Sequence, residues 1–320
     1  MIKYRVEPLD YKAVFENIVK GLNLYAESNG IKCYVIGLSG GLDSTVVSAL
    51  CKASNVPLIG VSLPCSTNKS DEVSSASLAG SEFCTEFNEI NLQEPFEVME
   101  KFCTKSSGLD STAISQGNIK ARLRMITLYD IASKRRGIVM GTSNLSEWWE
   151  GFWTIHGDSG DLNPIGELWK TEVYELAKWM KENVYKDSKA LDAAIKIVPT
   201  DGNGVSKSDM EQIMPGYTYA EIDHVLSKWE ALNPKIRPMY AADGLTESIK
   251  NTIFDAEDED VKNRRMEECK KHNKEFVPNL GDLYGVDSVR KVIMRSWNSE
   301  YKRRTLEACL SIQNGEVITH

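Results

Sequence analysis

A run of small and polar residues at positions 37–44 has the composition of a phosphate-binding loop. The run is Gly37, Leu38, Ser39, Gly40, Gly41, Leu42, Asp43 and Ser44. Adjacent glycines let the main chain approach a phosphate closely, because no Cβ intervenes. Apolar residues on both sides predict a strand before the loop and a helix after it, and the free N–H groups of a helix start favour an anion. The loop therefore predicts a nucleotide phosphate site, to which Ser39 and Ser44 add hydroxyl groups.

The same loop argues against transfer of a terminal phosphoryl group. It contains no Gly-Lys-Ser/Thr sequence, so it is not a Walker A loop, in which a lysine reaches the terminal phosphates. Asp43, at the expected helix start, has two interpretations. It is a first-turn carboxylate that the helix dipole favours, or it helps to hold Mg²⁺, a hard ion bound by a few carboxylates and by substrate phosphates. We expect the second.

The pattern Ser39-Gly-Gly-Leu-Asp-Ser44 resembles the pyrophosphate-binding loop of the N-type ATP pyrophosphatases. Those enzymes bind the β and γ phosphates and release them together, so attack falls on the α-phosphate. The resemblance implies that this chain splits ATP into AMP and pyrophosphate and uses the AMP half to activate a carboxylate.

Further blocks of sequence narrow the resemblance to one family. They are Gly117-Asn-Ile-Lys-Ala-Arg-Leu-Arg-Met, Gly141-Thr-Ser-Asn-Leu-Ser-Glu, Gly151-Phe-Trp-Thr-Ile-His-Gly-Asp-Ser-Gly-Asp, Leu168-Trp-Lys-Thr-Glu-Val-Tyr, Ile197-Val-Pro-Thr and Tyr219-Ala-Glu-Ile-Asp. In order and rough spacing they resemble NAD synthetase, which amidates nicotinate adenine dinucleotide (deamido-NAD) through an acyl adenylate. The resemblance covers about residues 15–280.

The resemblance implies roles for individual residues on the ATP side of the site. Asp43 and Glu147 match the Mg²⁺ ligands, and carboxylates bridged by a metal suit a triphosphate. The ATP contacts of the family match the loop 37–44 together with Thr142, Lys170 and Thr200. We predict that Lys170 is also catalytic, because a cation stabilises the charge that grows when the α-phosphate is attacked. The alternative is a solvated lysine.

The acceptor side rests on the same resemblance. Contacts to deamido-NAD match Arg122, Asp161, His272 and Lys274. Asp158 lies in the glycine-rich segment that the family places near the reacting carboxylate, and we predict that it is catalytic. The alternatives are a surface arginine at position 122 and a turn aspartate at position 158.

This side also departs from the ammonia-dependent bacterial enzymes. They have a lysine where this chain has Ile155 and an arginine where Ser62 stands, so two positive charges that would face an anionic ligand are missing. The segment 157–161 is one residue shorter than theirs, and His272-Asn-Lys replaces a contiguous His-Lys. His156 is a candidate for a substitute contact, although a lone histidine beside aromatic residues is more often packing.

Partners follow from the same comparison. Trp148, Trp149 and Trp153 either stack on a ring of the dinucleotide or lie in a subunit interface, where aromatic residues are enriched. We favour the interface, because the family forms homodimers with deamido-NAD near the subunit boundary.

Glutamine-dependent members carry an amidase domain before the synthetase, whereas here the strand that leads into the loop begins near Cys33. We therefore expect ammonia to be used directly.

Strands that alternate with helices must position these residues. Apolar periodicity predicts helices over 11–26, 45–51, 71–87, 95–102 and 119–134, and strands over 33–38, 58–63, 89–92 and 138–140. This alternation predicts a doubly wound parallel sheet flanked by helices, and the resemblance makes it adenine nucleotide alpha-hydrolase-like. We expect a synthetase domain over 1–280, a helical extension over 281–320, and polar loops over 106–111 and 201–208.

Composition limits the other classes of function. Of the 320 residues 42% are apolar and 26% charged, with no run near the ~18 apolar residues of a membrane span. The formal net charge of −8 disfavours nucleic-acid binding. Seven cysteines without a C-x-x-C pair predict neither a disulfide framework nor a zinc knuckle. The start of the chain lacks an export signal, so we expect a cytoplasmic protein.

Two rival functions remain open at this point. A tRNA-modifying pyrophosphatase would keep the ATP chemistry and change the acceptor, but the acidic charge and the missing C-x-x-C speak against it. A noncatalytic nucleotide sensor would keep the fold and lose turnover, but Ser39, Asp43, Glu147 and Lys170 are all present. Pyrophosphate release separates a sensor from an enzyme.

Overall fold

The computed structural model describes residues 9–158, 160–200, 208, 216–230, 259–271, 279–298, 308–310 and 317–319. The chain divides into two compact units: Leu9–Gly216 with Lys302–His320, and Tyr217–Tyr301 with Met1–Pro8. The first unit contains every predicted site residue that the structure describes. The domain boundary that we expect at residue 280 lies inside the second unit and stays a prediction.

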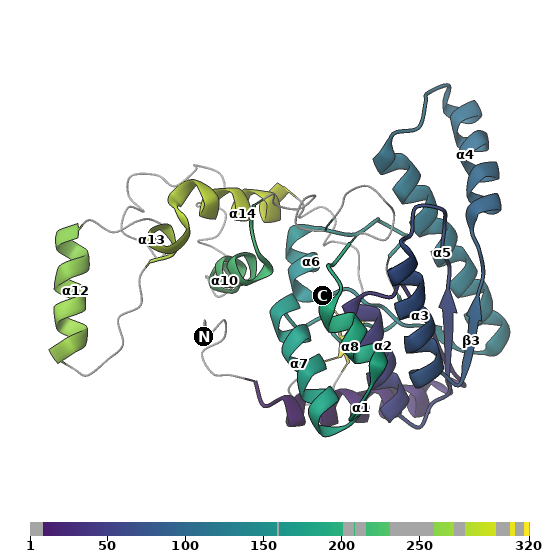
Figure 1. Ribbon diagram of the computed structural model, residues 1–320, viewed down its shortest axis with the longest axis horizontal. Helices are drawn as coiled ribbons and strands as arrows, with labels where there is room; N and C mark the ends of the chain where they lie inside the picture. Colours follow the sequence, from purple (N-terminus) through teal and green to yellow (C-terminus); the bar gives the residue numbers. More distant parts are fainter. Residues whose placement is uncertain are drawn as a thin grey trace. The chain divides into compact units, whose positions relative to one another are not determined.

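A parallel sheet lies at the centre of the first unit (Figure 1). Its strands are β1 (Tyr34–Gly37), β2 (Leu58–Ser62), β3 (Glu86–Glu89) and β4 (Ile138–Val139), in the order β3-β2-β1-β4. The register pairs Tyr34 with Leu58 on one side and with Ile138 on the other. Because β1 is a central strand, the loop that follows it begins in the interior of the sheet's carboxyl edge.

Helices cover both faces of this sheet. They are α1 (Tyr11–Asn29), α2 (Leu42–Ala53), α3 (Ser70–Phe83), α4 (Gln93–Ser107), α5 (Ala113–Arg135), α6 (Leu145–Glu150), α7 (Lys170–Asn183) and α8 (Lys189–Lys196). Tyr34 and Ile36 join one apolar core with α1, α2, α3, α7 and α8, whereas Val35 joins another with α4 and α5. This alternation is that of a strand covered on both faces, which confirms the doubly wound fold.

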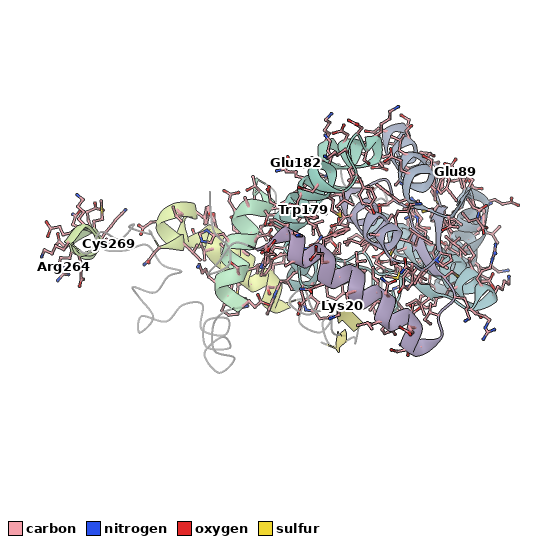
Figure 2. All side chains as sticks on the ribbon, turned by 90° about the horizontal axis from the view of Figure 1, so that it is seen from below. Lys20, Glu89, Trp179, Glu182, Arg264 and Cys269 are labelled. Carbon is pink, nitrogen blue, oxygen red and sulfur yellow. The ribbon has the colours of Figure 1, made fainter. Side chains whose placement is uncertain are left out.

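Packing between helices completes the first of these cores. Phe15 of α1 lies against Trp179 of α7, with ring centroids 5.6 Å apart; Figure 2 labels Trp179 beside α1. Phe83 of α3 meets Tyr185 edge-on at 5.2 Å. Aromatic pairs at such distances add stability beyond their buried area, so the core ties α1, α3 and α7 together.

The predicted elements are present, with some ends shifted. α2 begins at Leu42 rather than at residue 45, so the end of the phosphate loop is already the first turn of a helix. The helix predicted over 71–87 ends at Phe83, and the strand predicted over 89–92 is at Glu86–Glu89 instead. That strand is partly exposed at the edge of the sheet, where its Glu86 pairs with Ile59 of β2. It lacks the apolar run by which a buried strand is recognised. α4 also extends to Ser107, into the loop predicted over 106–111.

The second unit contains helices α10 (Tyr219–Glu230), α12 (Glu259–Lys271), α13 (Leu280–Tyr284) and α14 (Val286–Asn298). His224 Nδ1 lies 3.0 Å from Tyr284 Oη, and burial lowers the pKa of His224 to about 4, so the imidazole is neutral at pH 7. The expected helical extension contains α14, but also strands β5 (Ala308–Leu310) and β6 (Val317–Thr319), which pair in antiparallel fashion and belong to the first unit. Among the described helices, none is both long and apolar enough to cross a bilayer.

Candidate active site

The phosphate loop joins β1 to the first turn of α2 at the carboxyl edge of the sheet. Gly40 has φ +81°, and a Cβ there would overlap the main-chain carbonyl oxygen of Glu72. This position therefore requires glycine, both for its backbone angle and for its space. Ser39 Oγ accepts a hydrogen bond from the Gly41 N–H at 3.2 Å and lies 3.1 Å from Ser44 Oγ. The loop's own hydroxyl groups thus hold its shape.

Helix α2 leaves its first turn available to an anion. Gly41 is its N-cap residue, and a glycine at this position gives the helix no side-chain capping bond. The first N–H groups of a helix without such a cap are donors for a phosphate, and the helix dipole favours negative charge there. The predicted phosphate site is therefore supported by the local geometry.

A buried ammonium group lies beside this loop, between two carboxylates. Lys170 Nζ contacts Asp43 Oδ2 and lies 3.4 Å from Glu147 Oε1. The Lys170 side chain is 2% exposed, against 15% and 14% for the two carboxylates. Burying a charge is costly unless it is paired, so these three charges compensate one another. The interpretation of Lys170 as a solvated lysine is wrong.

Three helix starts bring this cluster together. Asp43 lies in the first turn of α2, Glu147 in α6, and Lys170 is the first residue of α7. Asn144 caps α6 by accepting from the Glu147 N–H at 3.0 Å, and its amide donates to Asp43 Oδ1 at 3.1 Å. The Lys170 N–H donates to Ser146 Oγ at 2.8 Å. The caps of the helices therefore also fix the charged side chains.

The donor set fits a small divalent cation. Asp43 and Glu147 converge on one point, because both contact the same ammonium nitrogen of Lys170. Among the described residues no group of three or more His, Cys, Asp or Glu side chains could hold a metal. Two carboxylates with phosphate oxygens and water are the surroundings that Mg²⁺ prefers, since it keeps several of its waters.

The two predicted threonine contacts lie at the same edge. Thr142 is partly buried just after β4, next to the carboxyl end of the central strand. Thr200 Oγ1 donates to Glu72 Oε1 at 2.7 Å, and Glu72 is the residue whose carbonyl oxygen limits Gly40. Ligands of open parallel sheets bind at this edge, so the structure brings the ATP-side residues into one region.

The acceptor-side residues are more exposed. Arg122 lies on α5 and donates from Nη2 to the carbonyl oxygen of Ile155 at 3.3 Å. Asp158 is exposed, and its Oδ2 accepts from the Thr154 N–H at 2.6 Å, which closes a turn. The contact between Arg122 and Ile155 brings this segment beside α5. Asp158 therefore has the geometry of a turn aspartate, and its catalytic role stays a prediction.

Asp161 has both carboxylate oxygens engaged within the protein. Oδ1 accepts from the Tyr129 hydroxyl at 3.1 Å, and Oδ2 accepts from the Val139 N–H at 2.8 Å. These bonds fasten the segment after residue 160 to β4 and α5. A contact of Asp161 with deamido-NAD stays a prediction, and the predicted contacts of His272 and Lys274 lie outside the described residues.

The aromatic cluster is partly explained by its own packing. Trp148 and Trp153 stack on each other, with ring centroids 5.1 Å apart and planes 7° apart. His156 is exposed, with φ +55°, an unusual angle for a residue that is not glycine. The stack joins α6 to the segment that follows it.

Two residues of the site were missed in the sequence. Asn144 precedes the apolar Leu145 and has Glu147 three residues after it, and this is the pattern of a capping box that would have revealed it. Glu72 gives a weaker signal, because a single glutamate in a first helical turn is common. Its contact with Gly40 depends on how α3 packs, which local sequence does not specify.

Comparisons with known proteins agree with this geometry. The family model described as NAD synthase matches residues 14–267. The NH3-dependent NAD+ synthetase of Finegoldia magna is 34% identical over 220 residues, which are 68% of this chain and 85% of the relative. The solved NH3-dependent NAD synthetase of Campylobacter jejuni, in complex with nitrate, is 25% identical with a TM-score of 0.54, over 84% of this chain and 99% of that one.

A further solved structure shares the fold over more of the chain. The NMN synthetase of Francisella tularensis has a TM-score of 0.65 at 22% identity, and the match covers 93% of this chain and 98% of that one. The family model and the Finegoldia magna relative both span most of this chain. The chain therefore belongs to the NAD synthase family.

Proposed function

We propose that this chain joins ammonia to the nicotinate carboxylate of deamido-NAD and forms NAD, while ATP is cleaved to AMP and pyrophosphate. The chain is a ligase that forms a carbon–nitrogen bond. The observation that carries the proposal is the buried cluster of Asp43, Lys170 and Glu147 beside a loop shaped for phosphate. The relatives named NH3-dependent NAD+ synthetases support the choice of acceptor and nitrogen source.

The first step is attack of a nicotinate carboxylate oxygen on the α-phosphorus of ATP. The bond between the α-phosphorus and the pyrophosphate oxygen breaks, which gives an acyl adenylate and pyrophosphate. The loop 37–44 and the first turn of α2 bind the phosphates, and Lys170 stabilises the charge that develops on them. Thr142 and Thr200 help to position the nucleotide.

The second step is attack of ammonia on the carbonyl carbon of the adenylate. The bond to AMP breaks and the nitrogen loses a proton, so the products are the amide and AMP. Adenylation makes this step possible because AMP leaves far more readily than an oxide ion. We propose that Arg122 and Asp161 bind deamido-NAD together with His272 and Lys274, and that Asp158 acts near the reacting carboxylate.

Asp43 and Glu147 are the residues that would hold Mg²⁺. Their carboxylates already converge on a cation, and oxygen ligands suit this ion. When bound, the metal supplies positive charge that neutralises the leaving pyrophosphate. Lys170 then acts from beside the two carboxylates as a second, fixed positive charge.

We propose that the protein works as a homodimer in the cytoplasm, where ATP and nicotinate dinucleotides are found. The dimer is supported by exposed apolar side chains on α4, on α5 and in the loop between them, which a second copy would cover. Val98 and Phe102 are each 65% exposed, Leu109 73% and Ile114 62%. The interface role of Trp148, Trp149 and Trp153 stays a prediction. Sedimentation of the purified chain tests the dimer.

The function is tested by measuring pyrophosphate release from Mg-ATP and ammonium, with and without deamido-NAD, while NAD is followed by absorbance after enzymatic reduction. We expect both products only when deamido-NAD is present. A parallel reaction with nicotinate mononucleotide asks whether the dinucleotide is required, which matters because Ile155 and Ser62 replace charged residues. If no pyrophosphate is released with deamido-NAD, the acceptor is a different molecule.

A further inference from the structure

A buried carboxylate on α3 connects two parts of the proposed ATP site. Glu72 is 8% exposed. Its main-chain carbonyl oxygen occupies the space that a side chain on Gly40 would need, and its Oε1 accepts from Thr200 Oγ1 at 2.7 Å. One residue therefore contacts both the phosphate loop and Thr200, which lies far from that loop in sequence.

The two carboxylate oxygens of Glu72 have different tasks. Oε2 accepts from the Lys69 N–H at 3.2 Å and from Asn68 Nδ2 at 3.1 Å, so it caps the first turn of α3. A cap of this kind uses one oxygen of the side chain. Oε1 contributes the bond to Thr200 instead, so helix capping alone does not explain this carboxylate.

Helix α5 supports the carboxylate from the other side. Arg124 Nη2 donates to Asn68 Oδ1 at 3.2 Å, and Arg124 Nε donates to the carbonyl oxygen of Leu63 at 3.1 Å. The same Asn68 oxygen also accepts from the Cys65 N–H at 2.9 Å. Asn68 is thus fixed by several bonds, and its amide then fixes Glu72.

We propose that Glu72 is a positioning residue for ATP, which holds the hydroxyl group of Thr200 in place beside the phosphate loop at Gly40. This inference rests on the proposed function, in which both the loop and Thr200 bind the nucleotide. A side chain that is already ordered loses little entropy when a ligand binds. Without the carboxylate, the Thr200 hydroxyl group would lose this bond before ATP binds.

The same helix provides a matched control. Glu82 of α3 accepts from the Lys189 N–H at 3.0 Å and from the Ala190 N–H at 3.1 Å, so it caps α8. Its loss removes a partly buried capping carboxylate from α3. The bonds and contacts of Gly40 and Thr200 stay as they are. The E82A variant should therefore unfold at a lower temperature and bind ATP as the wild type does.

The test is calorimetric binding of Mg²⁺ with α,β-methylene-ATP, an analogue that is not cleaved, to E72A, E72Q, T200V and E72A/T200V. We expect E72A and T200V each to raise Kd about tenfold. E72Q keeps one oxygen for the cap of α3, and its amide can donate to Thr200 Oγ1, so Kd should change less than about threefold. Because Glu72 acts through Thr200, the double variant should bind within about twofold of T200V alone.

Three results would overturn the inference: wild-type affinity in E72A, additive effects in the double variant, or a Kd in E82A raised as much as in E72A. If thermal melting shows that E72A does not fold, E72D takes its place, because its shorter carboxylate cannot both cap α3 and reach Thr200. The binding assay contains no acceptor. A wild-type chain that binds the analogue but makes no NAD would thus count against the proposed function and leave this test intact.

Discussion

Lys170 and Arg122 are both cations assigned to substrate binding, yet their surroundings differ. Lys170 is buried between Asp43 and Glu147, and hydrogen bonds to the side chains of Asn144 and Ser146 fix the starts of α6 and α7. Arg122 is exposed and donates to a main-chain carbonyl oxygen at 3.3 Å. The ATP side is thus built from charges that pair inside the protein, whereas on the acceptor side Arg122 and Asp158 face solvent.

This difference indicates which half of the site is organised in advance. On the ATP side, paired charges in a low-dielectric setting need little rearrangement when the triphosphate binds. On the acceptor side, Arg122 and the turn that contains Asp158 are held by fewer buried bonds, so more of the ordering has to come from the substrate. We therefore expect substitutions on the ATP side to reduce turnover and those on the acceptor side mainly to weaken substrate binding.

The largest effect should come from K170M. The change removes the cation from between Asp43 and Glu147, and we expect pyrophosphate release at saturating Mg-ATP to fall about 10³-fold. K178M is the control, because Lys178 lies on the same helix with its side chain 51% exposed. A K170M enzyme that retained more than a tenth of its turnover would contradict the comparison.

A pair of glycine substitutions should give the next largest effect. Gly40 and Gly30 both have positive φ, +81° and +65°, but a Cβ meets Glu72 at position 40 and open space at position 30. We expect G40A to lose about 3 kcal/mol of unfolding free energy and at least about tenfold in ATP affinity. G30A should lose about 1 kcal/mol, with ATP affinity unchanged. Urea unfolding and calorimetry measure both; equal losses would exclude the steric explanation.

Asp161 and Asp158 can be separated by stability. D161A removes the acceptors of Tyr129 and of the Val139 N–H, and we expect a loss of about 2 kcal/mol in unfolding free energy. D158A removes an exposed turn carboxylate and should cost less than about 1 kcal/mol, while it lowers turnover if Asp158 is catalytic. A stable D161A protein with a raised KM for deamido-NAD would instead make Asp161 a ligand contact.

The smallest effect should come from R122A. We expect its KM for deamido-NAD to rise about tenfold, with the KM for ATP unchanged and less than about 0.5 kcal/mol of stability lost. R122K keeps the charge and should lie between R122A and the wild type. Initial rates with each substrate varied in turn give both constants, and a rise in the KM for ATP would show that the two sides are not independent.

The sequence could predict the parts of the fold and site that depend on local pattern. Alternating apolar strands and helices gave the doubly wound sheet, and the paired glycines gave the phosphate loop, since both signals lie within a few residues. The partly exposed edge strand Glu86–Glu89 has no such signal, and its position depends on pairing with β2. The convergence of Asp43, Glu147 and Lys170 was implied by family resemblance, but the burial of the lysine needed the packing of three helices.

The stacked indole rings of Trp148 and Trp153 make α6 visible to optical spectroscopy. Rings 5.1 Å apart and nearly parallel are close enough for their electronic transitions to couple. Glu147, next to Trp148, belongs to the proposed metal site. A cation that shifts the glutamate would also change the angle between the rings. Near-ultraviolet circular dichroism could therefore follow occupation of the site without label or turnover, and W153F would silence the signal.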